Sequence, residues 1–282
     1  MRGFGYTVKD SCEAVGLSRS YYYARRNGVE VRRKRARDDS ALIEKVKELK
    51  TNHPFWGYRR IRAWLVYRGC MAVNGKKVRR IMKENGLITV HQRGRRCRGT
   101  VLPKARASRP LQIWGIDMTK FFIDSFGWAY LVIVLDWCTK KIVGWDLSTR
   151  CKSKDWLKAL DEAVLNEFPN GTRGHGLKLV SDNGCQPTAT AFIKTASLLG
   201  IEQIYTSYNN PKGNADTERM MRTIKEELIW LNNFASFEQA KNALQNWIEN
   251  DYNKLYVHST LGYLSPDEFE KQFHRQTSAT IA

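Results

Sequence analysis

Residues 112–122 read Gln-Ile-Trp-Gly-Ile-Asp-Met-Thr-Lys-Phe-Phe, an apolar stretch as long as a strand with one acid, Asp117, at its centre. Aromatic and β-branched side chains of this kind are enriched in strands. A carboxylate inside such a strand is unfavourable unless it is paired or binds a cation. The stretch therefore predicts a central strand that carries a functional acid.

The sequence that follows this strand alternates between further strands and helices. Two more apolar stretches, 128–136 and 141–147, come after short turns and predict three antiparallel strands in sequence. Apolar residues at helical spacing, such as Trp156, Leu160 and Val164, then alternate with short buried strands. Helices are expected at 154–167, 188–199, 214–230 and 237–252, and strands at 177–181 and 201–206. This order of elements predicts an α/β fold of the ribonuclease H-like type.

Two more acids stand at the ends of predicted elements. Asp182 ends the fourth strand, and Glu218 opens a helix, with the 35 residues 183–217 between them. Carboxylate oxygens suit Mg²⁺ or Mn²⁺, and two such ions can activate a nucleophile and stabilise a leaving oxygen in phosphoryl transfer. Asp117, Asp182 and Glu218 are therefore the candidate catalytic and metal-binding residues, and we expect them to hold two ions.

Each of these acids also has a plainer interpretation. Asp117 could accept a hydrogen bond from the backbone, and Asp182 could belong to a turn. Glu218 could be an exposed acid that the helix dipole favours in the first turn. These separate roles do not explain the spacing of the three acids. Asp216 is two residues from Glu218, about 200° away around a helix. Asp136 stands at the far end of the second strand. We therefore expect neither rival to be a ligand.

The positive charge of the chain is concentrated in its first 110 residues. The formal net charge is +19. Residues 1–110 carry 29 Lys and Arg against 8 Asp and Glu, whereas residues 111–282 carry 18 against 20. A basic segment of this size indicates a polyanionic partner, and nucleic acid is the first candidate.

Membrane and secreted classes fit this sequence less well. The longest apolar run, 128–135, has eight residues, far fewer than a membrane span requires. The N-terminal sequence lacks the apolar run of a signal peptide. The six cysteines form no CxxC pair and have no His at zinc-ligand spacing. We expect a cytoplasmic protein without a membrane segment, a disulfide framework or a structural zinc.

The basic part predicts two helix-turn-helix regions. Residues 8–26 read as a helix, a turn at Gly16 and a second helix that begins at Ser18. The second region has helices expected at 40–51, 58–68 and 74–84. The expected parts of the chain are an N-terminal region with a basic linker (1–37), a second helix-turn-helix region (38–90), a basic extended linker (91–109), the catalytic core (110–272) and a C-terminal tail (273–282).

Twelve basic residues are candidates for contact with DNA. Solvent-exposed helix surfaces often carry such charges without binding any ligand. The net charge of residues 1–110 as a whole therefore supports DNA binding better than any single basic residue does. By their spacing, Glu218, Arg222 and Lys225 share one stripe of a helix. Lys225 is expected either to hold a phosphate beside the acid or to form a surface salt bridge. The candidates are Arg59, Arg60, Lys76, Lys77, Arg79, Arg80, Arg93, Arg95, Arg96, Arg219, Arg222 and Lys225.

The three acids and their spacing resemble the DDE signature of retroviral integrases and bacterial insertion-sequence transposases. The similarity is greatest to the second-reading-frame product of the insertion sequence three family. Many relatives have Arg or His and then a Gly-Ser/Thr pair after the second acid, where this chain has Asn183-Gly184-Cys185. The shared motifs include His-Pro-Phe-Trp-Gly-Tyr-Arg-Arg-Ile (53–61), Val-Arg-Arg-Ile-Met-Lys-Glu-Asn-Gly-Leu (78–87), Ile-Val-Gly-Trp (142–145), Gly-Asn-Ala (213–215) and Leu-Gly-Tyr-Leu-Ser-Pro (261–266).

The resemblance implies a transposase that cuts DNA beside a transposon end and joins the resulting 3′-OH to another phosphodiester, through a circular intermediate. It implies Mg²⁺, with Mn²⁺ also supporting activity. The implied partners are transposon-end DNA, target DNA, further copies of the chain on that DNA, and a first-reading-frame product or fusion. Two alternatives stay open: a nuclease of the same fold without strand transfer, and a DNA-binding regulator or inactive transposase remnant.

Overall fold

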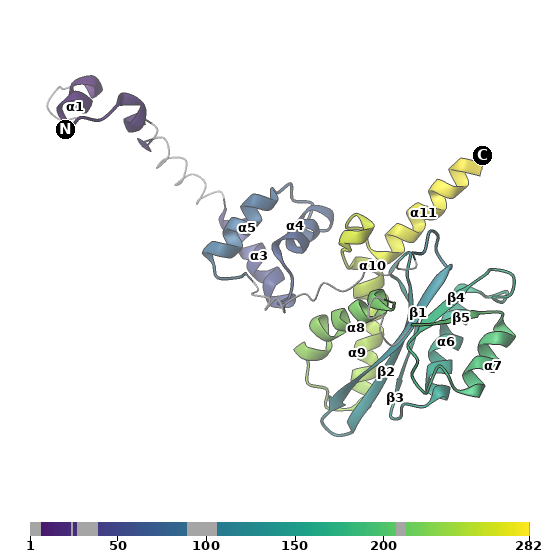
Figure 1. The fold of residues 1–282 in the computed structure, drawn as a ribbon. Coiled ribbons are helices and arrows are strands. Elements are labelled where there is room, and N and C mark those ends of the chain that lie inside the picture. Colours follow the sequence, from purple (N-terminus) through teal and green to yellow (C-terminus); the bar gives the residue numbers. More distant parts are fainter. Residues whose placement is uncertain (1–6, 24, 27–38, 89–105, 207–212, 282) are drawn as a thin grey trace. The chain divides into compact units, whose positions relative to one another are not determined.

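The computed structural model describes residues 7–23, 25–26, 39–88, 106–206 and 213–281 (Figure 1). The chain divides into two compact units, one of residues 1–62 with 72–89 and one of residues 63–71 with 90–282. The division passes through helix α4 (Tyr58–Tyr67).

The helix, the turn and the start of the second helix predicted for residues 8–26 are present in the described residues. α1 (Val8–Ala14) begins at a capping box, in which Thr7 Oγ1 accepts the Asp10 N–H at 3.2 Å. Gly16 has φ +65, the left-handed conformation that ends helices. Ser18 Oγ accepts the Tyr21 N–H at 3.2 Å, and residues 19–23 are helical, which confirms the cap.

The second helical region also follows the apolar spacing of the sequence. α3 (Ser40–Asn52) buries Leu42, Val46 and Leu49. α5 (Gly75–Glu84) begins at Asn74, whose side chain accepts the Lys76 N–H at 2.8 Å. Its buried residues are Val78, Ile81 and Met82.

The second unit contains a five-stranded sheet in the order β3-β2-β1-β4-β5. The β1–β2 and β2–β3 pairs are antiparallel, and the β1–β4 and β4–β5 pairs are parallel. All five predicted strands are present, within one or two residues at each end. Their bounds are β1 Ile113–Ile123, β2 Gly127–Asp136, β3 Ile142–Ser148, β4 Lys178–Ser181 and β5 Glu202–Tyr205.

Helices cover both faces of this sheet (Figure 1). α6 (Ser153–Glu167) and α7 (Thr190–Leu199) lie on one face, over a core that includes Trp114, Ile116 and Trp156. α6 approaches so closely that a Cβ at Gly144 would lie 2.4 Å from the Ala159 carbonyl oxygen. α8 (Ala215–Glu227) packs on the opposite face, where the side chain of Asp117 points.

The C-terminal quarter differs in part from the sequence prediction. The helix expected at 214–230 ends at Glu227 and continues as the 3₁₀ turn η2 (Ile229–Leu231). The helix expected at 237–252 is α9 (Phe237–Asn246) followed by the π-helical turn η3 (Trp247–Tyr252). α10 (Asn253–Leu255), η4 (Ser259–Leu261) and α11 (Pro266–Ile281) complete the chain, and the sequence prediction lacks α11.

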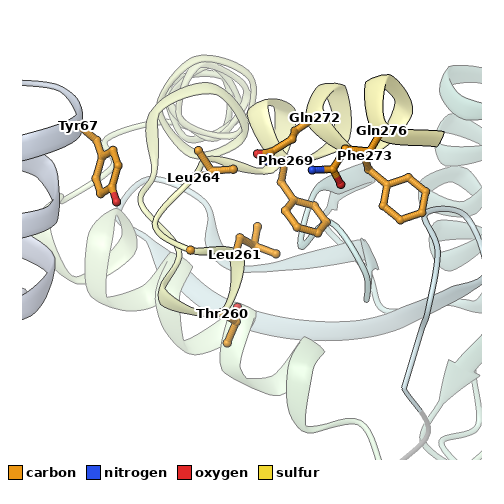
Figure 2. A pocket seen from close by; sticks show the side chains of 9 residues that line it. Tyr67, Thr260, Leu261, Leu264, Phe269, Gln272, Phe273 and Gln276 are labelled. Carbon is orange, nitrogen blue, oxygen red and sulfur yellow. The ribbon is translucent and has the colours of Figure 1, made fainter. Parts of the chain in front are cut away.

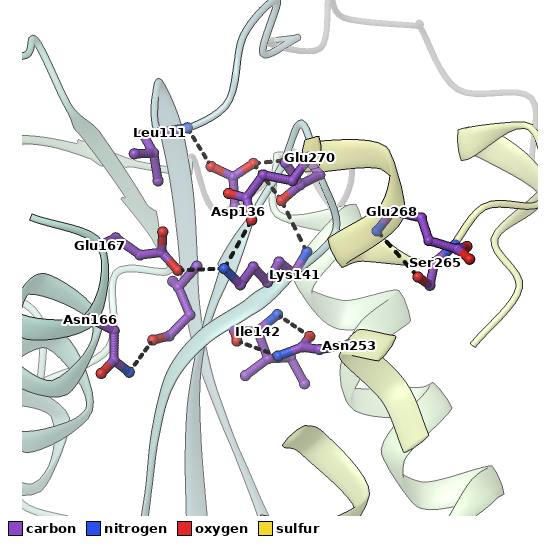
Figure 3. A network of polar contacts seen from close by, with 12 residues as sticks. Leu111, Asp136, Lys141, Ile142, Asn166, Glu167, Asn253, Ser265, Glu268 and Glu270 are labelled. Carbon is purple, nitrogen blue, oxygen red and sulfur yellow. Dashed lines mark hydrogen bonds and ion pairs between the residues drawn. The ribbon is translucent and has the colours of Figure 1, made fainter. Parts of the chain in front are cut away.

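A polar network fastens these last helices to the start of β3 (Figure 3). The Asn253 side chain accepts the Ile142 N–H at 3.1 Å and donates to the Ile142 carbonyl at 3.0 Å. The Lys141 ammonium pairs with Glu167 at 2.9 Å and with Glu270 at 3.0 Å. Burial lowers the pKa of Lys141, but the two carboxylates outweigh it and raise that pKa above its ordinary value. The network therefore holds α6, α10 and α11 at one sheet corner. Among the helices that the structure describes, none is long and apolar enough to cross a membrane.

Candidate active site

Two of the predicted acids lie on neighbouring parallel strands. Gly115 of β1 pairs with Val180 of β4. Asp117 and Asp182 each come two residues after this pair, so the same register brings Asp117, in the middle of β1, beside Asp182, the residue that follows β4. Neighbouring strands are about 4.8 Å apart. The topology therefore explains why two acids 65 residues apart in the sequence become neighbours.

The third acid comes from the first turn of α8, which is fixed to β1. Asn214, the residue before α8, donates from Nδ2 to the Ile116 carbonyl at 3.3 Å. Thr217 is fully buried and accepts a hydrogen bond from the Trp137 indole at 3.1 Å. Glu218 follows Thr217 directly and is exposed. The start of α8 therefore lies beside the part of β1 that carries Asp117.

Asp117 is the acid whose electrostatic surroundings stand out. Burial raises the pKa of Asp117 to about 6 from an ordinary value of 3.8. The Met118 N–H, which donates to Asp117 Oδ1 at 2.8 Å, opposes this rise. The carboxylates of Asp182 and Glu218 add to it, and the Lys225 ammonium opposes it. The excess of negative charge around Asp117 is what a bound cation would neutralise.

The carboxylates are near one another without being gathered around one point. Among the described residues, no three His, Cys, Asp or Glu side chains have a geometry that could hold a metal ion. Asp117 Oδ1 accepts the N–H of the next residue, and Asp182 Oδ1 accepts the Gly184 N–H at 3.1 Å. These local bonds turn both carboxylates toward their own backbone. Each bond uses only Oδ1, so the second carboxylate oxygen of Asp117 and of Asp182 stays available to an ion.

The basic residues of α8 differ in their surroundings. Arg222 Nε donates to Glu226, four residues later on the helix, at 2.7 Å. A surface salt bridge of this kind was one of the two roles expected for Lys225, but here Arg222 forms it. Arg219 lies 3.8 Å from the same carboxylate. Lys225 is half-buried and lies within electrostatic reach of Asp117. Of the predicted DNA contacts on α8, Lys225 is therefore the one associated with the acids.

The rival acids have structural partners. Asp136 is 1% exposed and accepts the N–H groups of Leu111, Cys138 and Thr139 at 2.7–2.8 Å. Asp216 pairs with the Lys140 ammonium at 3.1 Å. Asp136 therefore holds the backbone of the turn after β2, and Asp216 joins that turn to α8. The sequence also offers His258 as a histidine near the end of the chain, and its Nε2 lies 2.8 Å from the Tyr252 hydroxyl, which is a structural contact.

In the first unit, part of the basic surface is already engaged within the protein. Asp39 is 2% exposed and forms ion pairs of 2.5 Å with both Lys77 and Arg80. These two contacts lower the pKa of Asp39, although burial opposes them. The predicted contacts Lys76 and Arg79 are exposed on the same helix, α5.

The remaining predicted contacts lie beside aromatic rings or outside the described residues. The guanidinium groups of Arg59 and Arg79 lie 5.7 and 5.8 Å from the Tyr58 ring, and that of Arg60 lies 5.7 Å from the Trp56 ring. Three candidates, Arg93, Arg95 and Arg96, fall outside the described residues. The basic linker predicted within residues 1–37 and most of the one at 91–109 fall outside them as well.

Sequence reasoning missed the residues that seat α8 on the sheet. Trp137, Lys140 and Thr217 are absent from the predicted site, although all three join the β2–β3 turn to α8. One signal was present: Gly115 interrupts an otherwise bulky strand, and a glycine in a strand often marks the close approach of another segment.

A pocket of about 490 Å³ also lies in the second unit, away from the three acids (Figure 2). None of the acids lines it. Its walls are largely α11 and the segment before it, with Leu264, Phe269 and Phe273 among the apolar side chains. The pocket therefore plays no part in the candidate active site.

Family models match most of the chain. Residues 107–211 match a model described as integrase core domain, and residues 199–266 match a second model of the same description. Residues 36–96 match a model described as HTH-like domain. These matches, with the mixed sheet centred on β1, confirm the expected ribonuclease H-like α/β fold and the helix-turn-helix region before it.

Individual proteins are similar to this chain along much of its length. The chain is 27% identical to the transposase InsD for insertion element IS2A/D/F/H/I/K of Escherichia coli, over 96% of this chain and 92% of the relative. Among solved structures, it resembles a chain of the simian T-cell lymphotropic virus intasome in complex with PP2A regulatory subunit B56 gamma (TM-score 0.47, 17% identity, 80% of this chain and 74% of the other). It also resembles the catalytic domain of Mos1 mariner transposase (TM-score 0.44, 17% identity, 58% and 76%).

Proposed function

We propose that the chain is a transposase of the insertion sequence three family, which cuts DNA at the ends of its element and transfers the new 3′-OH to a second phosphodiester. The matches to integrase core domain models and the 27% identity to an insertion-element transposase over 96% of the chain support this proposal. Asp117, Asp182 and Glu218 are the catalytic residues. The product of the first transfer is a circular intermediate, which is later inserted into target DNA.

The observation that supports this proposal most directly is the electrostatic coupling of the three acids at Asp117. A half-buried carboxylate beside two others is stabilised by a cation, and an all-oxygen donor set suits Mg²⁺ or Mn²⁺. The donor chemistry therefore fits two such ions. When bound, they would supply Lewis-acid activation of a nucleophile and stabilisation of the leaving oxygen.

The residues around the acids have separate roles in this proposal. The three carboxylates bind and orient the ions, and the start of α8 fixes where Glu218 stands relative to β1. The Lys225 ammonium attracts a phosphate next to the reacting bond. The exposed cations of α5 and its neighbours contact the phosphates of the element ends, with no metal required. Further copies of the chain are expected on the same DNA.

Lys225→Ala is expected to lower the joining rate about tenfold, because one charge-assisted contact near the reacting phosphate is lost. Overall DNA affinity should change little, since a single phosphate contact among many contributes modestly. Joining rate and melting temperature are measured on the same variant, with Lys225→Arg as the charge-preserving control. Normal joining by Lys225→Ala together with a slightly lower melting temperature would assign Lys225 a surface role instead.

Strand transfer on a DNA duplex that carries the element's own end sequence tests the proposed function. Labelled ends, purified protein and Mg²⁺ should yield branched or circular joined products that resist denaturation. Cleavage without any joined product would indicate a nuclease of the same fold. Binding without cleavage in either Mg²⁺ or Mn²⁺ would indicate a regulator or an inactive remnant.

A further inference from the structure

The turn between β2 and β3 contacts the first turn of α8 at two places. The Trp137 indole Nε1 donates to Thr217 Oγ1 at 3.1 Å, and both residues are buried. The Lys140 ammonium lies 3.1 Å from a carboxylate oxygen of Asp216. The two contacts therefore hold consecutive residues of α8, Asp216 and Thr217, and Glu218 is the next residue.

The first of these bonds lies directly over β1, two residues before Asp117. A Cβ built on Gly115 would lie 2.0 Å from Thr217 Oγ1 and 2.4 Å from Trp137 Nε1. No side chain therefore fits between β1 and this hydrogen bond. The same Cβ would lie 3.0 Å from Asn214 Oδ1, so the residue before α8 also lies close to Gly115.

The turn itself is held rigidly, so it can serve as a fixed reference for α8. Asp136 Oδ1 accepts the N–H groups of Cys138 and Thr139, both at 2.8 Å. The Tyr252 hydroxyl donates to the Lys140 carbonyl at 2.7 Å. Through Tyr252, the turn is also fastened to the C-terminal helices.

We propose that Trp137 and Thr217 are positioning residues of the active site. Their buried hydrogen bond sets how the first turn of α8 lies on β1, and thereby sets the separation of the Glu218 and Asp117 carboxylates. This inference rests on the proposed function, because it concerns the metal site that those acids form. Both side chains are buried, so they would act on the site through α8 and β1.

Magnitudes favour positioning over a purely structural role. A single hydrogen bond adds only modestly to folding stability. A misplacement of about 1 Å at a reacting centre, by contrast, can cost about 100-fold in rate. Residues that orient metal ligands typically change metal affinity by about 10-fold or more when they are altered. Loss of this bond should therefore affect metal binding far more than stability.

The full-length chain offers a matched control on the same helix. Thr223 is a buried threonine of α8 whose hydroxyl donates to the Arg219 carbonyl of its own helix at 3.0 Å. Thr217→Val and Thr223→Val remove the same group from the same helix, but only the first breaks the bond to Trp137. Thr217→Ser restores the hydroxyl, and Trp137→Phe removes the donor from the other side.

The affinity of each variant for Mn²⁺ is measured by electron paramagnetic resonance without DNA, alongside its melting temperature. Thr217→Val and Trp137→Phe should each bind Mn²⁺ about tenfold more weakly than the wild type. Thr217→Ser and Thr223→Val should bind it within about twofold of the wild type, with all melting temperatures within a few degrees. If Thr217→Val fails to fold, Trp137→Phe carries the same expectation.

Asp117→Asn separates failure of this inference from failure of the proposed function. If Asp117→Asn loses Mn²⁺ binding while Thr217→Val and Trp137→Phe keep it, the acids form the site and the positioning role is wrong. Equal weakening in Thr217→Val and Thr223→Val would also overturn it. If neither the wild type nor any variant binds Mn²⁺, the metal site is wrong, and the positioning inference fails with it.

Discussion

Asp117→Asn, Asp182→Asn and Glu218→Gln are each expected to lower the rates of DNA cleavage and joining by about 1,000-fold or more. Metal ions contribute several kcal/mol of transition-state stabilisation, which corresponds to a factor of this size. Each substitution removes one negative charge and keeps the side-chain shape. Affinity for the end DNA should remain within about threefold, because we expect it to come mostly from phosphate contacts by the basic residues 1–110.

The measurement is a single-turnover cleavage assay in Mg²⁺ and in Mn²⁺, with end binding followed in parallel. Asp124→Asn is the matched control, because Asp124 is an exposed acid just after β1 and is not part of the proposed site. It should cleave at the wild-type rate. If any one of the three acid variants retains near-normal joining, that residue is not part of the site.

The second large effect concerns stability in the absence of metal. Asp117 has a folded pKa of about 6 against an ordinary value of 3.8. The protonated acid therefore stabilises the folded state below about pH 4, and this contribution is lost as the pH rises through about 6. Asp117→Asn should then raise the free energy of unfolding at pH 7.5 by about 1–3 kcal/mol, with solvent screening reducing the upper value. At pH 4 the two proteins should be equally stable.

Urea unfolding in a chelator, at pH 4 and pH 7.5, checks this expectation. The charges of Asp182, Glu218 and Lys225 act on Asp117, and dissolved salt screens such charges. Wild type and variant are therefore compared at the same ionic strength. Addition of Mg²⁺ at pH 7.5 should stabilise the wild type and reduce the advantage of Asp117→Asn. Equal stability of the two proteins at pH 7.5 without metal would contradict the raised pKa.

The strands could be predicted because their apolar runs are bounded by turns. The segment 128–136, for example, ends at an acid, and β2 ends at the same residue. The last helices were harder to predict. Trp247 and Ile248 continue the helical spacing of α9, but the backbone there is a π-helix. Apolar spacing over so few residues does not show where one winding changes into the other.

The candidate acids could also be chosen from the sequence. Asp117 stands inside an apolar strand, where a carboxylate is costly unless it binds a partner or an ion, and Asp182 and Glu218 were chosen for their spacing of 35 intervening residues. The arrangement of the three acids relative to one another could not be predicted from the sequence, since it depends on strand register and on where α8 packs on the sheet. Thr217 and Trp137 show this limit. They are 80 residues apart, and a threonine or a tryptophan carries no distinctive signal until the fold brings the two together. Asp39 is similar, because only the structure shows that it engages Lys77 and Arg80.

The parallel pairing of β1 with β4 also sets an order of events during synthesis. β1, β2 and β3 form from neighbouring segments, but the site waits for the long crossover to β4 and then for α8. About 130 residues (89–218) separate the end of the first unit from Glu218. Synthesis proceeds at about 5–20 residues per second. The first unit, which we propose binds DNA, is therefore complete roughly ten seconds before Glu218, the third acid, is added. If both proposals hold, the nascent chain can bind DNA during that interval and cannot cut it.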